Sequence, residues 1–185
     1  YFPKNVKKIL WFYYEGNDLI DLNRELKSDL LRKYFNEESF SQDLYLKQDF
    51  VDKKLIDLIK YKEIEKKTDK TKIYFDKFIK ILKLSTIREF LLPKHRPSKD
   101  FIKIMSKVKK FSDKNNSKLY FIYLPEYSRY RYNLHNTSYS TVKSIIQNLG
   151  IEFIDIDQEV FENLENPLSL FPFELPGHYN VNGYY

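Results

Sequence analysis

Two short glycine-containing segments carry the side chains that could do chemistry. The first reads EGND at residues 15–18, and the second reads GHYNVNGY at residues 177–184. A histidine such as His178 can take a proton as a general base, and the amide of an asparagine such as Asn17 can donate a hydrogen bond to a developing oxyanion. These residue types indicate acid–base chemistry at one site, provided that the fold brings the two segments together.

The elements that must position these segments are three apolar runs, which we predict to be buried strands at residues 6–14, 119–124 and 151–156. Runs that are apolar on both faces and separated by helical stretches are typical of a parallel sheet covered by helices on both sides. EGND directly follows the first strand, and the histidine segment lies in a loop beyond the last. Ligands of open α/β sheets bind at the carboxyl ends of the strands, so we expect both segments at that rim.

The spacing of apolar residues predicts helices at residues 101–112 and 140–149, and Gly150 is expected to end the second of them. Asp18 is expected to be the N-cap of the helix that follows the first strand, rather than a participant in the chemistry. From residue 100 onward the order of helix, strand, helix and strand therefore predicts a layered α/β domain.

A different pattern lies between the first strand and this part of the chain. Three amphipathic helices are predicted there, at residues 29–35, 50–65 and 71–84. We therefore expect an α/β core formed by residues 1–23 and 100–185, with a helical insertion at residues 24–99. The insertion could be a lid over the site or a docking surface for another protein.

The composition excludes several classes of protein. The 185 residues include no cysteine, which excludes a disulfide scaffold, a thiolate metal site and a cysteine nucleophile. The formal net charge of +6 comes from 32 basic and 26 acidic residues, which are interleaved instead of forming a basic stripe. We therefore expect no nucleic-acid partner, and polyanion binding is an alternative that rests on net charge alone. No apolar run approaches the roughly 20 residues that span a bilayer.

The segments around these motifs resemble the SGNH/GDSL hydrolase superfamily, in particular its bacterial branch with a helical insertion. The resemblance rests on EGNDLIDL at residues 15–22 after a strand, KLYFIYLP at 118–125 and LFPFELPGHYNVNGYY at 170–185. It implies a flavodoxin-like α/β/α fold and a serine esterase or acyltransferase that acts on an acylated carbohydrate or a similar ester. No metal or organic cofactor is implied. By position, the resemblance makes Asn17 the oxyanion-hole asparagine and His178 the catalytic base.

Two positions depart from the family's pattern. Glu15 stands where the family usually has glycine, and Leu175 stands where an aspartate, three residues before the histidine, usually orients the imidazole. Glu174 is a candidate substitute, as are Asp155 and Asp157 at the end of the third predicted strand. A serine–histidine dyad oriented by a backbone carbonyl is equally compatible.

The nucleophile is a further departure, because no Gly-Asp-Ser block occurs in the chain. In the family this block follows an earlier strand, and residues 6–14 resemble the family's third strand. We therefore expect a fragment of an enzyme, inactive on its own, whose serine belongs to an amino-terminal segment outside these residues. Without a neighbouring strand, the apolar edge at residues 6–14 would face solvent.

The loop after the second predicted strand adds candidate substrate contacts. Tyr127, Arg129 and Arg131 belong to a run of alternating tyrosine and arginine that could bind a sugar face or an anionic group. Ordinary packing is the alternative, because aromatic residues make up 17% of the chain.

The alternative to an enzyme is a catalytically inactive binding module with an SGNH-like fold. Leu175 in place of the acid favours the binding module. The presence of both Asn17 and His178 favours the enzyme.

Overall fold

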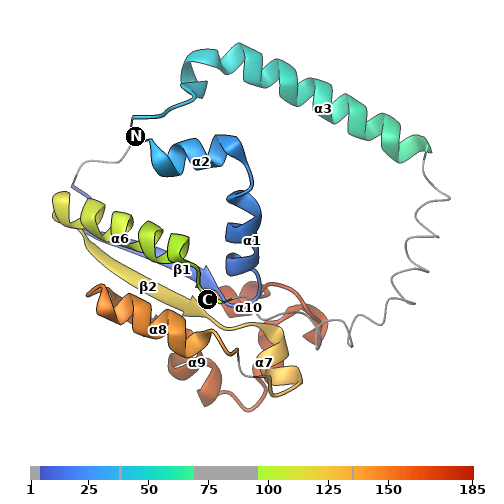
Figure 1. Cartoon of the computed structure of the whole chain (residues 1–185). Helices are drawn as coiled ribbons and strands as arrows, with labels where there is room; N and C mark the ends of the chain where they lie inside the picture. The colour runs from blue at the N-terminus through green and yellow to red at the C-terminus, as the bar shows by residue number, and fades with distance from the viewer. Residues whose placement is uncertain (1–4, 38, 69–95, 135) are drawn as a thin grey trace. The chain divides into compact units, whose positions relative to one another are not determined.

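The computed structural model describes residues 5–37, 39–68, 96–134 and 136–185 (Figure 1). The predicted helix at residues 71–84 lies outside these ranges. The chain divides into two compact units, one formed by residues 1–35 with 94–185 and the other by residues 36–93.

Three parallel strands form the sheet of the first unit, in the order β1-β2-β3. The strands are β1 (Lys8–Tyr14), β2 (Lys118–Leu124) and β3 (Glu152–Asp155). The predicted strands and their parallel direction are therefore confirmed. Tyr14 pairs with Leu124, and Tyr123 pairs with Asp155, so the carboxyl ends of all three strands meet at one edge of the sheet.

The described residues of this unit form four helices of at least eight residues, of which the second ends one position beyond the unit: α1 (Asp18–Glu25), α2 (Asp29–Asn36), α6 (Lys99–Lys114) and α8 (Tyr139–Asn148). The predicted helices at residues 29–35, 101–112 and 140–149 are confirmed. The hydroxyl of Ser98 caps α6 by accepting the N–H of Phe101 at 3.3 Å. Gly150, with a φ of +66°, follows the end of α8 in the left-handed region that glycine adopts without strain.

The main core lies on the face of the sheet that carries the odd-numbered side chains of β1 and β2. Tyr13, Phe121 and Tyr123 are almost fully buried there, and they pack against residues of α1, α6 and α8. Both crossover helices lie on this face because right-handed connections between consecutive strands in sequential order return on the same side. Figure 1 shows α6 and α8 running alongside β1 and β2.

The opposite face of β1 is largely uncovered in the part of the chain that the structure describes. Leu10 is 51% exposed and Phe12 is 59% exposed, although they alternate with buried Tyr13 in the same strand. The expectation of helices on both sides of the sheet therefore does not hold for β1 within the described residues. The architecture is mixed α/β with a three-stranded parallel sheet.

A second apolar cluster covers the carboxyl edge of the sheet. Its buried members are Tyr127, Phe161, Phe171 and Tyr179, and Tyr14 and Leu124 from the strand ends pack against it. The short helices that contribute to this region or border it are α7 (Tyr127–Arg131), α9 (Ile156–Glu159), η2 (Phe161–Asn163), η3 (Pro167–Leu170), η4 (Pro172–Glu174) and α10 (Val181–Tyr184). The C-terminal segment is thus folded against the rim where the sequence predicts a site.

The described part of the second unit contains η1 (Leu44–Lys47) and α3 (Gln48–Thr68). The helix predicted at residues 50–65 is confirmed and extends beyond both predicted ends. In neither unit do the described residues include a helix that is long and apolar enough to cross a membrane.

Candidate functional site

Asn17 lies at the turn between β1 and α1, at the carboxyl edge of the sheet. Its Nδ2 donates a hydrogen bond to Oδ2 of Asp21 at 2.6 Å, and Oδ1 of Asp21 also accepts a bond from Arg24 at 2.8 Å. These contacts fix the orientation of the Asn17 amide, because only its nitrogen can donate to a carboxylate. The amide oxygen of Asn17 is buried without a hydrogen-bond partner among the described residues.

The side chain of Tyr14, the last residue of β1, connects this turn to the histidine segment. Its ring centroid lies 4.8 Å from that of His178, and its hydroxyl donates to the carbonyl of Gly177 at 3.1 Å. A Cβ atom at Gly16 would lie only 2.6 Å from Cε1 of Tyr14, so a glycine allows the ring to lie close to the backbone. The structure therefore brings His178 to the end of the strand that precedes Asn17.

Tyrosine hydroxyls hold the backbone on both sides of His178. Tyr14 contacts Gly177, and Tyr127 donates to the carbonyl of Glu174 at 3.0 Å. Immediately after the histidine, buried Tyr179 donates to the carbonyl of Pro125 in the loop that follows β2. These contacts hold the backbone before and after His178, whose imidazole is exposed.

Asp18 does not have the role expected from the sequence. The N-cap position of α1 is occupied by Asn17, and Oδ2 of Asp18 accepts the backbone N–H of Tyr14 at 2.9 Å. The prediction that Asp18 is the N-cap is therefore wrong, because its side chain turns back to the strand. Burial is the largest effect on the Asp18 carboxyl and raises its pKa, as does the charge of Asp21. The hydrogen bond from Tyr14 and the charge of His178 lower the pKa, but the net shift is upward.

The carboxylates expected to replace the orienting acid have other partners. Oε1 of Glu174 accepts a hydrogen bond from Asn166 at 2.9 Å. Oδ2 of Asp157 accepts one from Arg129 at 2.8 Å, and its Oδ1 accepts the hydroxyl of Tyr130. None of these three contacts joins Glu174 or Asp157 to the imidazole of His178.

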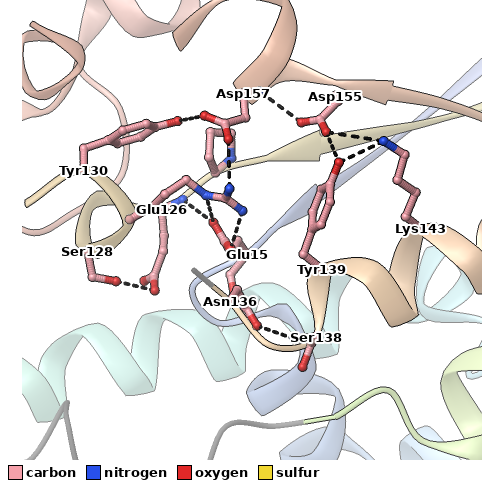
Figure 2. A network of polar contacts seen from close by, with 12 residues as sticks. Glu15, Glu126, Ser128, Tyr130, Asn136, Ser138, Tyr139, Lys143, Asp155 and Asp157 are labelled. Carbon is pink, nitrogen blue, oxygen red and sulfur yellow. Dashed lines mark hydrogen bonds and ion pairs between the residues drawn. The ribbon is translucent and has the colours of Figure 1, made fainter. Parts of the chain in front are cut away.

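Asp155, the third carboxylate that the sequence offered, is also engaged. It accepts the hydroxyl of Tyr139, and Nζ of Lys143 lies 4.0 Å from Oδ2 (Figure 2). Its Oδ1 accepts the backbone N–H of Asp157 and so caps α9.

Glu15, which departs from the family's pattern, is the centre of a buried ion network. Its fully buried carboxylate accepts two hydrogen bonds from Arg129, at 2.8 Å from Nη2 and 3.1 Å from Nε. It also accepts the backbone N–H of Glu126 at 3.0 Å, which ties the end of β1 to the loop after β2 (Figure 2). Charge-assisted pairs of this bidentate kind are stronger and more directional than neutral hydrogen bonds.

The predicted substrate contacts fall in different environments. Arg129 is 9% exposed in its side chain and bridges Glu15 and Asp157. Burial lowers the pKa of Arg129, but the two carboxylates outweigh this effect and raise it overall. Tyr127 is buried in the second cluster, whereas Arg131 is exposed.

A cavity of about 200 Å³ lies beyond the carboxyl ends of β2 and β3. The residues that line it are polar or aromatic: Arg129, Asn136, Tyr139, Asp155, Asp157, Gln158 and Glu162. Of the residues that the sequence analysis names, the structure thus brings Arg129, Asp155 and Asp157 together at this cavity.

The sequence alone did not identify Tyr14 and Glu15 as parts of the site. Tyr14 was part of an apolar strand, and only its place as the last strand residue before EGND could have marked it. Glu15 carried a signal, since it stood where the resembled family has glycine, but its partner Arg129 is 114 positions away.

The described residues contain no group of three or more histidine, aspartate and glutamate side chains that could hold a metal ion. Comparison with known proteins gives no match, either to a family model, to a curated protein or to a solved structure.

Proposed function

We propose that the chain is part of an SGNH-type serine ester hydrolase or O-acyltransferase that acts on an acylated carbohydrate or a similar ester. One observation carries the proposal. His178, which the sequence predicts as general base, contacts the ring of Tyr14 with a centroid distance of 4.8 Å, and Tyr14 ends the strand that precedes the turn with Asn17, the predicted oxyanion donor. A partial flavodoxin-like arrangement of the parallel sheet belongs to the same proposal.

In the proposed reaction, a serine Oγ attacks the acyl carbonyl and His178 takes the serine proton. The tetrahedral intermediate then expels the alcohol, which receives that proton from the imidazolium, and an acyl-enzyme remains. Water or the hydroxyl of an acceptor attacks the acyl-enzyme, again with His178 as base, and restores the serine. Hydrolysis and transfer differ only in this second nucleophile.

Asn17 would stabilise the oxyanion of each tetrahedral intermediate. The contact with Asp21 occupies one amide N–H and fixes the plane of the amide. An amide nitrogen has two hydrogens, so a second N–H can point to the substrate oxygen. Loss of one such donor costs about 2.7–4 kcal/mol of transition-state stabilisation in comparable sites.

The serine in this proposal belongs to the turn that follows a strand next to β1. Within the described residues β1 pairs only with β2, so its other edge has backbone groups available for a further strand. A parallel strand added there would end at the same rim as Tyr14. Its following turn would therefore lie near Asn17, where the family's Gly-Asp-Ser block is expected.

A non-catalytic binding module with the same fold is the second candidate. The observation that favours it is the environment of the imidazole. Leu175, at the position of the family's acid, is 58% exposed, while Glu174 and Asp157 are bound to Asn166 and Arg129.

A fluorophosphonate probe, which reacts covalently with an activated serine, tests the proposal on the native full-length polypeptide. We expect labelling of one serine, and a loss of about 10²-fold or more in labelling rate for His178→Ala and Asn17→Ala. Circular dichroism spectra of the variants should match that of the native protein. Absence of labelling in the native protein would overturn the proposed enzymatic activity and favour the binding module.

A further inference from the structure

The cavity beyond the carboxyl ends of β2 and β3 has walls that can hydrogen-bond to a ligand. Each of its seven lining residues carries a polar side-chain atom, and none of them is an aliphatic residue. Its volume of about 200 Å³ lies below that of pockets for drug-sized ligands, which measure roughly 300–1,000 Å³. The cavity therefore suits a small polar ligand, of the size of one sugar ring, and does not suit an apolar chain.

The charges around this cavity favour a neutral ligand. Arg129 bonds to Asp157 at 2.8 Å, and Lys143 lies 4.0 Å from Asp155 (Figure 2). A cation would have to compete with these two side chains for the carboxylates. An anion would meet three carboxylates, because exposed Glu162 also lines the cavity. No group of three or more side chains that could hold a metal ion occurs among the described residues.

Arg129 and Asn136 have hydrogen-bond donors left for such a ligand. The guanidinium of Arg129 has five N–H groups, of which three bond to Glu15 and Asp157. The other two have no acceptor within the described part of the chain, although this side chain is only 9% exposed. Asn136 uses one of its two amide hydrogens, in a bond to the carbonyl of Glu15 at 3.4 Å. Donors near a buried wall cost free energy when they stay unbonded, so a ligand oxygen would stabilise them.

The same wall offers acceptors. Each carboxylate oxygen of Asp155 and Asp157 can accept more than one hydrogen bond. Gln158 provides a donor and an acceptor in a single amide, and its exposed side chain makes no hydrogen bond within the described ranges. A sugar hydroxyl both donates and accepts hydrogen bonds, so a ring with several hydroxyls matches a wall of this mixed kind.

The cavity also borders the turn that carries the predicted oxyanion donor. Asn136 lines the cavity, and its amide bonds to the backbone of Glu15, two residues before Asn17. We propose that the cavity binds a single neutral sugar ring and is the carbohydrate subsite for the acylated substrate. Its part in ester chemistry rests on the proposed function, whereas the binding of the sugar can be measured without any activity.

NMR titrations of the native full-length protein test the binding. The probes are the neutral methyl glycosides of glucose, galactose, mannose and N-acetylglucosamine. We expect at least one of them to bind saturably and to shift the side-chain amide signals of Asn136 and Gln158. Methylammonium chloride and inorganic phosphate are the charged probes, and neither should shift these signals. No shift with any of the glycosides, or shifts with a charged probe alone, would overturn the proposal.

Two glutamine variants test the location of the sugar. Gln158→Leu removes a donor and an acceptor from the wall and should weaken glycoside binding about 3- to 10-fold. Gln147→Leu is the matched control, because Gln147 is exposed on α8 and does not line the cavity. Its affinity should stay within about twofold of the native value. Native circular dichroism spectra establish that both variants are folded, and equal affinities in the two variants would overturn the location.

Failure of the sugar site can be distinguished from failure of the proposed function. If the native protein reacts with the fluorophosphonate but binds none of the glycosides, only the sugar site is overturned. If a glycoside binds at the cavity and the protein does not react, the ester chemistry is overturned and the sugar site belongs to a binding module.

Discussion

The guanidinium of Arg129 donates two hydrogen bonds to the carboxylate of Glu15, from Nη2 at 2.8 Å and from Nε at 3.1 Å, although 114 positions separate the two residues. The pair is almost completely removed from solvent, and Nη1 of the same guanidinium reaches Asp157 at 2.8 Å. One side chain thus links the end of β1 to α7 and to α9. This arrangement fixes the rim on which the candidate site is built.

Removal of one partner of this pair should destabilise the protein strongly. We expect Glu15→Ala to lower the free energy of unfolding by about 3–5 kcal/mol, because it weakens the pairing of a buried guanidinium. Urea denaturation followed by circular dichroism measures the change. Lys109→Ala is the matched control, since Lys109 pairs with Asp113 at the surface of α6, and it should cost less than about 1 kcal/mol. Equal effects would show that the buried network has no special structural role.

Asp18→Asn should stabilise the protein at neutral pH. The folded-state pKa of Asp18 is raised above its ordinary value of 3.8, mainly by burial. Stability from such a group is fully present below the ordinary value and is lost as the pH rises through the folded-state pKa. Asparagine does not ionise, so its advantage should be present at pH 7 and should shrink as the pH falls. Urea denaturation at several pH values gives this difference, and an advantage that grows toward acid pH would contradict it.

Buried tyrosines should make the protein sensitive to alkali. Burial raises the pKa of Tyr13, Tyr123, Tyr130 and Tyr179 above the ordinary 10.0. Their contribution to stability is present below pH 10 and is lost as the pH rises. We therefore expect absorbance at 295 nm to rise together with the loss of the circular dichroism signal. In concentrated urea the same tyrosines should ionise near pH 10 without a cooperative step, and ionisation of every tyrosine while the circular dichroism signal is retained would contradict the burial of these groups.

The two faces of the sheet should respond differently to substitution. Phe12→Lys should change the free energy of unfolding by less than about 1 kcal/mol, because Phe12 is 59% exposed. It should also reduce the binding of an apolar dye and any self-association through the exposed apolar face of β1. Phe121→Ala, on the buried face of β2, is the contrasting variant and should cost about 3–5 kcal/mol. A similar loss for both variants would show that the exposed face is covered in solution.

The ring of Tyr14 should tolerate a methyl group at one neighbouring glycine but not at another. A Cβ at Gly16 would overlap Tyr14, whereas a Cβ at Gly177 has no atom within 4 Å. Gly16→Ala should therefore cost about 1–3 kcal/mol and displace the ring from His178. The proton shifts of His178, which depend on the nearby aromatic ring, should change in Gly16→Ala and remain in Gly177→Ala. The reverse order would contradict the packing of Tyr14 on Gly16.

Local patterns in the sequence were sufficient to predict the three strands and most of the helices of the first unit. Apolar runs such as residues 119–124 and the helix-ending Gly150 depend on neighbours along the chain, so their signals are visible without a structure. The sequence did not show in this way which face of the sheet would be covered by helices. Leu10 and Phe12 have the residue types of a buried strand, yet their exposure depends on which elements lie above them.

The sequence predicts where the candidate site lies, at the carboxyl edge of the sheet, but not which contacts its residues make. Asn17 and His178 followed from residue type and from the rule that strand ends form the rim of a site. The partners of Glu15, Asp18 and Asp157 depend on contacts between distant segments. No spacing in the sequence could show that Arg129 would occupy two of these carboxylates.

The long separation of β1 from β2 has a consequence for the order of folding. Ser117, which precedes β2, bonds to the carbonyl of Val6 across 111 positions, whereas β2 and β3 are joined by a short segment that includes α8. Pairing of segments that are close in the chain is faster, so β2, α8 and β3 should assemble before β1 joins them. Tyr14 arrives with β1, together with the turn that carries Asn17, and contacts His178 only at that step. A nascent chain would therefore assemble the candidate site as one of its last folding events, after the apolar core around β2 and β3 has formed.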